Sequence, residues 1–271
     1  PLVMYWNRDI LTTAGVSTPP SYWDEMFKFG ENLSIKDGAF NINRSAVAFG
    51  EFRNVVHAKE ILSALMIQAG SPVVSVVNNI PTSQLLNKSN TAVLPSQAAL
   101  SFYTEFSNPA KPYFSWNRSL PDSETSFLSG DLVLYFGFGS EASTLKLKNP
   151  NLNFDIREFP QSRTGEKKTT FGKMTAIAIV KNSVNVGPAF TALTAFIGPD
   201  MVSTFAKELQ AAPSRRDLLS DRPNDSIGPV LYESALWSDS WFDSDNTETD
   251  RIFERMIESV TGGRAKYQDA V

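Results

Sequence analysis

Short apolar runs alternate along this chain with segments whose apolar residues recur every three or four positions. The runs predict strands, because buried strands appear as continuous apolar stretches and edge strands as alternating ones. The predicted strands are Leu2–Trp6, Ala46–Gly50, Leu132–Phe136, Phe154–Phe159 and Met174–Val180. The amphipathic segments predict helices over Ser21–Leu33, Asn54–Ala69, Ser96–Phe106, Pro121–Leu128, Pro188–Ile197, Met201–Leu209, Ile227–Trp237, Thr247–Val260 and Ala265–Val271, and one starting near Ser140. Interleaved strands and helices indicate the α/β class.

The opening of the chain reads like the middle of a protein. A buried strand starts at the second residue, with no initiator Met, basic stretch or apolar leader before it. A short helix pattern follows and ends at Gly15, where a left-handed cap costs nothing. We therefore expect further sequence upstream of Pro1 in the complete protein. The less regular stretch Val73–Leu94 predicts a surface ribbon.

Composition is that of an ordinary globular protein, with 42% hydrophobic and 20% charged residues. The 25 basic and 29 acidic residues give a net charge of −4, which disfavours a nucleic-acid partner. The basic cluster Arg163–Lys168 is interpreted as a solvated hairpin tip. No apolar run approaches the roughly 18 residues of a membrane span. The absence of Cys excludes disulfides and thiolate metal sites and is compatible with export.

Motifs for nucleophilic, zinc and dinucleotide chemistry are incomplete. The only histidine, His57, falls inside the predicted helix Asn54–Ala69, where a partly exposed structural histidine is expected. No G-x-S-x-G elbow is present, and one His without Cys cannot hold zinc. The pair Gly137-x-Gly139 follows a strand, but Ala142 stands in the third glycine's place and no downstream ribose acid is evident. No cofactor is predicted.

An acidic segment near the C-terminus has four positions of a calcium loop, at Asp243, Asp245, Thr247 and Glu254. The required glycine is replaced by Glu248, and we interpret the segment as an acidic helix N-terminus, with ion binding left open. A carboxylate pair for glycoside hydrolysis also stays open, because Asp and Glu are plentiful and none stands out at a strand end.

Five aromatic residues lie at the ends of predicted elements. They are Phe52, Trp116, Phe138, Trp237 and Trp241, and the polar residues Arg53, Asn54, Ser140 and Asp239 lie beside them. Each aromatic alone is more simply a core residue. Together they suit a sugar site, since sugar rings stack their C–H faces on aromatic planes while polar side chains bind the hydroxyls.

The order of several segments resembles a known family. The carrying segments are Leu2–Leu11 with Ala14-Gly15 and Trp23-Asp-Glu, Phe127–Gly137, Phe171–Val180, Leu209 to Pro213-Ser-Arg-Arg, and Val260–Arg264. Together they are similar to the extracellular solute-binding proteins of bacterial ABC importers, in the carbohydrate-binding group that includes maltose-binding protein. The similarity covers essentially the whole chain in the right order.

This resemblance implies a type II periplasmic-binding-protein-like fold with two α/β lobes joined by crossing strands. It further implies that the first third of such a protein is absent. On this basis residues 1–165 and 220–271 are expected to form the C-terminal lobe. Residues 166–219 are expected to be a returning segment of the N-terminal lobe. The opening strand would then be a crossover between the lobes.

The implied function is the ligand-binding component of an importer, without catalysis, which binds a sugar or oligosaccharide and delivers it to an ABC permease. The expected location is extracellular or periplasmic, with a lipoprotein anchor in the full-length form. The loops after Phe49, Tyr135 and Leu236 would form one cleft wall. The predicted ligand-binding residues are Phe52, Arg53, Asn54, Phe138, Ser140, Trp237 and Trp241. The alternatives are a glycoside hydrolase fragment and a stand-alone carbohydrate-sensing domain.

Overall fold

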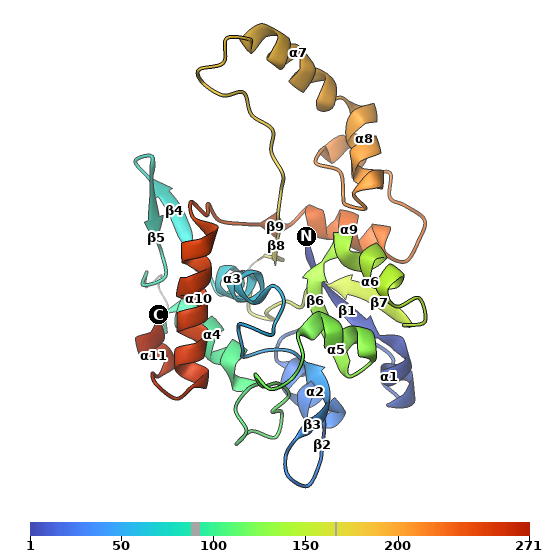
Figure 1. The fold of residues 1–271 in the computed structure, drawn as a ribbon, viewed down its shortest axis with the longest axis vertical. Helices are drawn as coiled ribbons and strands as arrows, with labels where there is room; N and C mark the ends of the chain where they lie inside the picture. The colour runs from blue at the N-terminus through green and yellow to red at the C-terminus, as the bar shows by residue number, and fades with distance from the viewer. Residues whose placement is uncertain (88–92, 166) are drawn as a thin grey trace.

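A five-stranded sheet organises the fold (Figure 1). The computed structural model describes residues 1–87, 93–165 and 167–271. The strand order is β2-β3-β6-β1-β7, with β1 antiparallel to both neighbours and β3 parallel to β6. The strands are β1 (Leu2–Asn7), β2 (Ile35–Lys36), β3 (Ile42–Val47), β6 (Leu132–Phe138) and β7 (Phe154–Glu158).

The sheet confirms the predicted strands Leu2–Trp6, Leu132–Phe136 and Phe154–Phe159. The predicted strand Ala46–Gly50 overlaps β3 only at Ala46 and Val47, since β3 begins and ends earlier in the chain. Leu2, Val3, Met4 and Tyr5 are fully buried, because β1 lies inside the sheet and helices cover its faces. The alternating segment Phe154–Glu158 is an edge strand, as its pattern predicts. Strand β6 continues two residues beyond the prediction, to Phe138.

Helices pack around the sheet and confirm most of the predicted pattern. They are α1 (Arg8–Thr13), α2 (Glu25–Leu33), α3 (Ala58–Gln68), α4 (Pro95–Glu105), α5 (Ser123–Ser129), α6 (Ala142–Lys148), α9 (Gly228–Ala235), α10 (Asn246–Thr261) and α11 (Tyr267–Ala270), with short 3-10 turns η1 (Gly139–Glu141) and η2 (Arg216–Leu218). Gly15 takes a left-handed conformation after α1, as predicted.

Two helices begin later than their periodicity indicates. Helix α2 begins at Glu25, whose carboxylate accepts hydrogen bonds from the backbone N–H groups of Ser21 and Tyr22 and so closes a turn ahead of the helix. Helix α3 begins at Ala58, not at Asn54, because the Asn54 side chain is committed to a neighbouring loop. His57 therefore precedes α3, and the prediction that it lies within the helix is wrong.

The predicted ribbon over Val73–Leu94 contains a hairpin of β4 (Val74–Val77) and β5 (Ile80–Ser83), which stands out at the edge of the molecule in Figure 1. Asn78 and Asn79 form its turn with positive φ angles, which asparagine tolerates well. Residues 88–92 of the predicted ribbon lie outside the described residues. So does residue 166 of the predicted hairpin tip at Arg163–Lys168.

Residues 172–219 form an arm that extends away from the sheet (Figure 1). It carries α7 (Val186–Phe196) and α8 (Pro199–Glu208), separated at Gly198 as the sequence indicates. The predicted strand Met174–Val180 is wrong: among the described residues no strand pairs with this segment, which lies extended and exposed. Met174, Val184 and Phe190 are 81%, 95% and 66% exposed. Large apolar side chains are thus left uncovered along the arm.

The described residues contain no single helix long and apolar enough to cross a membrane. Helices α7 and α8, bent by 67° relative to each other, pass that test as a pair on length and composition alone.

Gly50 provides a test of how the first cleft loop is packed. Its φ is +96°, and a Cβ there would lie 2.4 Å from Ser107 Oγ and 3.0 Å from Ser107 N. Gly50→Ala should lower the free energy of unfolding by about 3 kcal/mol, because backbone strain adds to a clash. Gly70→Ala, at φ +100° with open space around it, should cost only about 1 kcal/mol. Urea unfolding measures both, and equal losses would contradict this packing.

Candidate functional site

Three segments that leave the sheet and its neighbouring helices meet at one cleft of about 290 Å³. The loop after β3 contributes Phe52 and His57, and the start of α3 contributes Lys59 and Glu60. Lys173 comes from the base of the arm, and Asn246 and Asp250 come from α10. The cleft therefore combines an aromatic ring with side chains of both charges.

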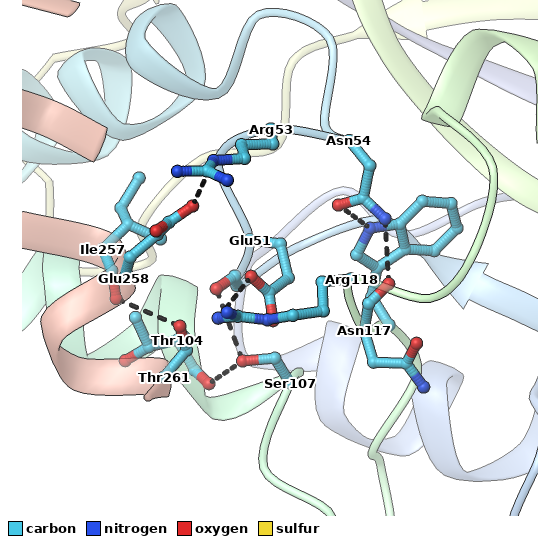
Figure 2. A network of polar contacts seen from close by, with 12 residues as sticks. Glu51, Arg53, Asn54, Thr104, Ser107, Asn117, Arg118, Ile257, Glu258 and Thr261 are labelled. Carbon is cyan, nitrogen blue, oxygen red and sulfur yellow. Dashed lines mark hydrogen bonds and ion pairs between the residues drawn. The ribbon is translucent and has the colours of Figure 1, made fainter. Parts of the chain in front are cut away.

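The loop after β3 is anchored at its first residues by hydrogen bonds to Glu51. The Glu51 carboxylate, which is buried, accepts a hydrogen bond from Arg118 at 3.2 Å, and the Glu51 carbonyl accepts one from the Tyr103 hydroxyl at 2.8 Å. Burial of Glu51 raises its pKa, and the nearby Arg118 only partly offsets that effect. Figure 2 shows Arg118 reaching Glu51. These contacts fix the base of the loop that carries Phe52 and His57.

Glu141, in the turn after β6, collects three hydrogen bonds. Its Oε1 lies 2.7 Å from His57 Nε2 and accepts from the Phe138 backbone N–H at 2.7 Å. Its Oε2 accepts from the Tyr135 hydroxyl at 2.6 Å. Burial alone would raise the Glu141 pKa, but the hydrogen bonds and the imidazole outweigh burial and lower it. Burial of the Tyr135 hydroxyl raises its pKa, and the nearby negative charge of Glu141 raises it further.

Phe138 is held from several sides. Its carbonyl accepts a hydrogen bond from the Tyr5 hydroxyl at 2.6 Å, so its backbone is fixed at both N–H and C=O. The His57 ring meets the Phe138 ring edge-on, with centroids 4.9 Å apart. The Lys173 ammonium lies over the Phe138 ring, 5.0 Å from its centroid, and also pairs with Glu60 at 2.6 Å. Phe138 is not itself a lining residue, but it contacts His57 and Lys173, which line the cleft.

The Gly137-x-Gly139 pattern has a packing explanation. A Cβ at Gly137 would lie 2.6 Å from both Glu141 Oε2 and the Tyr135 ring, and one at Gly139 would lie 1.9 Å from Leu231. The two glycines let the Glu141 network and α9 approach the end of β6 closely. This close approach, rather than a phosphate-binding loop, accounts for the glycines.

Lys59 joins the starts of α3 and α10. Its ammonium, on a side chain only 7% exposed, lies 3.0 Å from Asp243 Oδ2 and 2.5 Å from Asp250 Oδ1. It also donates to Asn246 Oδ1 at 2.7 Å. Burial alone would lower the Lys59 pKa, but the hydrogen bonds to Asp250 and Asp243 outweigh it and raise the pKa. The cleft's buried cation is therefore fully neutralised by its own surroundings.

Arg53 and Asn54 point in opposite directions from the same loop (Figure 2). Arg53, whose side chain is 75% exposed, pairs with Glu254 at 2.8 Å and with Glu258 at 3.0 Å on α10. The Asn54 amide donates to the carbonyls of Asn117 and Leu120 and accepts from the Trp116 indole N–H. Asn54 thus holds loops together, and Arg53 links the loop to α10.

The other predicted residues are dispersed. Trp241 stacks on Phe253 and donates its indole N–H to Ser63 Oγ, while Lys59 approaches its ring. Trp237 has Lys168 over its ring, and its buried indole N–H has no partner among the described residues. Ser140 is exposed in η1. Trp116, singled out with the loop aromatics, is fully buried and belongs to the core.

The acidic segment of the proposed calcium loop is already engaged. Asp243 binds Lys59, Asp245 caps α10 through the N–H groups of Thr247 and Glu248, and Glu254 binds Arg53. Across residues 1–87, 93–165 and 167–271, no group of three His, Cys, Asp or Glu side chains is arranged to hold a metal ion. The interpretation as an acidic helix start fits these contacts.

A second, larger hollow of about 490 Å³ lies among Phe27, Phe102, Glu105, Lys111 and Tyr113. Its polar groups bind one another, since the Glu105 carboxylate takes hydrogen bonds from Tyr113 and pairs with Lys111. No predicted site residue lines it. The smaller cleft is the stronger candidate, because the ends of three separate elements meet there.

Sequence reasoning missed His57, Lys59, Glu60, Lys173 and Glu141. His57 was assigned to a helix interior, and the acids and lysines carry no local motif because their partners are distant in sequence. Each of these contacts joins segments that only the fold brings together. The one local signal for the site is the pair Gly137 and Gly139 on either side of Phe138, which indicates that other side chains pack closely against the end of β6.

Comparison with known proteins gives one family and a consistent fold. The family model described as bacterial extracellular solute-binding protein matches residues 1–202. Among solved structures, the cyclic α-maltosyl-1,6-maltose binding protein from Arthrobacter globiformis is 18% identical, with a TM-score of 0.73 over 99% of this chain and 66% of that chain. The cyclo/maltodextrin-binding protein complexed with maltotetraose is 12% identical, with a TM-score of 0.72 over 99% and 65%.

The structure titled CpMnBP1 with mannotriose bound is 16% identical, with a TM-score of 0.68 over 99% of this chain and 68% of that chain. This chain therefore spans about two thirds of the length of these structures. A search of curated proteins gives no match. The predicted family resemblance and the predicted α/β, periplasmic-binding-protein-like fold are confirmed.

The lowered pKa of Glu141 predicts a pH-dependent contribution to stability. A carboxyl with a folded pKa below its ordinary value of 4.5 stabilises the fold above that value, and this stabilisation is lost as the pH falls through the folded pKa. Glu141→Gln should cost about 2 kcal/mol at pH 7 in urea unfolding, and the difference from wild type should shrink below pH ~4.5.

Glu124→Gln is the matched control, because its side chain is also 25% exposed and pairs with a single base, Lys148. It should cost less than about 1 kcal/mol at pH 7. A Glu141→Gln difference that stays constant down to pH 3 would contradict the assignment of Glu141 as the stabilising carboxylate.

Proposed function

This chain belongs to the bacterial extracellular solute-binding proteins, and we propose that it is the sugar-binding component of an ABC importer. The observation that carries the proposal is the meeting of Phe52 and His57 with paired polar side chains at one cleft, where Phe138 packs against the His57 ring. Aromatic faces pack on the C–H faces of sugar rings, and the surrounding donors and acceptors bind hydroxyls. The fold relatives, whose titles name oligosaccharides, support the same ligand class.

The pairing of charges in the cleft favours a neutral ligand. Lys59 is matched by Asp243 and Asp250, and Lys173 by Glu60. A charged ligand would need an unpaired group of opposite sign or would have to break one of these ion pairs. A polyhydroxylated neutral molecule needs neither.

We further propose that the ligand lies between two lobes. Residues 1–165 and 220–271 would form one lobe, and residues 166–219 would belong to the other. The uncovered apolar residues of the arm support this division, since burying them against a second lobe would remove them from water. The greater length of the fold relatives also supports it. Lobe closure around the sugar would then present a surface to the permease.

The family description supports an extracellular or periplasmic location. Anchoring as a lipoprotein is a proposal that concerns the full-length protein. We propose a binding role with no catalytic step, in keeping with the solute-binding family to which the chain belongs. Delivery to the permease would depend on ligand release when the lobes open.

Phe138 gives the most direct test of the proposed sugar site. In the complete gene product, Phe138→Ala should weaken binding of the best ligand in a panel of mannobiose, mannotriose and maltotetraose by about tenfold, because a stacking surface is removed. Isothermal titration calorimetry measures the affinity. Phe40→Ala is the control, since Phe40 is an exposed aromatic in the turn between β2 and β3 and should leave affinity unchanged.

Two outcomes would argue against this proposal. Equal affinity in wild type and Phe138→Ala would remove Phe138 from the site. Absence of heat with every neutral sugar in the panel, together with turnover of chromogenic glycosides, would favour the glycoside hydrolase alternative.

A further inference from the structure

We propose that His57 selects the ligand through a hydrogen bond that its Nδ1 accepts from a sugar hydroxyl, and that Glu141 is the positioning residue for this contact. The inference rests on the proposed function and deepens it. It assigns a specificity-determining residue to the cleft wall beside Phe138. Its basis is the hydrogen bonding of Glu141, the backbone at His57 and the position of the imidazole in the cleft.

The backbone at His57 is unusual for a residue that starts a helix. His57 precedes α3 with φ +63° and ψ +26°, in the left-handed region that non-glycine residues seldom occupy. Such conformations persist where the surroundings hold them, and they gather at binding sites. Here the left-handed turn accompanies a ring that lines the cleft and meets Glu141 and Phe138.

The hydrogen bonds of Glu141 set the tautomer of His57. An ionised carboxylate only accepts hydrogen bonds, and Tyr135 and the Phe138 N–H already donate to this one. His57 Nε2, at 2.7 Å, must therefore carry the proton that it donates to Oε1. Glu141 is ionised at neutral pH, because even the ordinary carboxyl pKa of 4.5 lies well below 7. In the neutral ring the second nitrogen, Nδ1, is then an acceptor.

Nδ1 is the acceptor left available on this wall. Within the described part of the chain no hydrogen bond to Nδ1 is found, and the His57 side chain is 20% exposed at the cleft. The neighbouring charges are engaged, with Glu60 on Lys173 and Asp250 on Lys59. A sugar ring beside Phe138 would present hydroxyls next to the imidazole. A hydroxyl is the neutral donor that such an acceptor selects.

The tautomer can be read directly, because His57 is the only histidine of this chain. Nitrogen-15 correlation spectra of the complete gene product, with the His57 signals assigned by their loss in His57→Phe, should show the Nε2–H tautomer at neutral pH. Adding the best-bound member of the neutral panel should shift the Nδ1 resonance. An Nδ1–H tautomer, or an Nδ1 signal that does not move at saturation, would overturn the inference.

Two variants test the roles of His57 and Glu141 separately. His57→Phe keeps an aromatic edge against Phe138 and removes both nitrogens, so affinity should fall by about tenfold. The melting temperature should also fall, because Glu141 loses a hydrogen-bond partner, and affinity is therefore compared at a temperature where both proteins are folded. Glu141→Gln, whose amide can donate as well as accept, should let the Nδ1–H tautomer appear and weaken binding. Glu124→Gln should leave tautomer and affinity as in wild type.

The outcomes separate this inference from the proposed function. If wild type binds a neutral sugar and His57→Phe binds it equally well, the inference is wrong and the proposed function stands. If wild type binds none of the sugars, both are wrong, even where the Nε2–H tautomer is observed.

Discussion

The cleft wall depends on one partly buried carboxylate, Glu141. Its two oxygens bind the His57 ring, the Tyr135 hydroxyl and the Phe138 N–H, and thereby join the loop after β3 to the end of β6. The arrangement favours glycine at position 137, because a Cβ there would collide with the Glu141 carboxylate and the Tyr135 ring. A single acceptor-only group therefore fixes an aromatic ring, an imidazole and a backbone turn relative to one another.

The arm shows the opposite situation, in which a hydrophobic pattern has no partner. Met174–Val180 is a nearly continuous apolar run of the kind that predicts a strand, and α7 carries exposed Phe190 and Phe196. Apolar side chains lower the free energy only when something covers them. The arm and the cleft are connected, because Lys173 at the base of the arm pairs with Glu60 and lies over Phe138. Movement of the arm would therefore displace Lys173 and change the shape of the cleft.

Local periodicity was sufficient for most of the fold and for little of the site. Three strands, the end of a fourth and most helices follow from apolar spacing, since burial on one face dictates that spacing. Met174–Val180 failed because strand pairing depends on a neighbour, which periodicity does not report. Of the predicted residues, Phe52 lines the cleft and Phe138 contacts the lining residue His57, but Asn54 binds other loops. His57 is predicted to lie within a helix, whereas it precedes one. Contacts such as His57 with Glu141 join residues 84 positions apart, and no local pattern encodes them.

The central claim is that a neutral sugar binds beside Phe138 and His57. A crystal structure of the complete gene product with its preferred neutral oligosaccharide tests this most directly. The account predicts a sugar ring against Phe138, with a hydroxyl hydrogen-bonded to His57 Nδ1 and the Glu141 network unchanged. An oligosaccharide bound instead in the hollow lined by Phe102 and Tyr113, with the cleft lined by Phe52 and His57 empty, would contradict it.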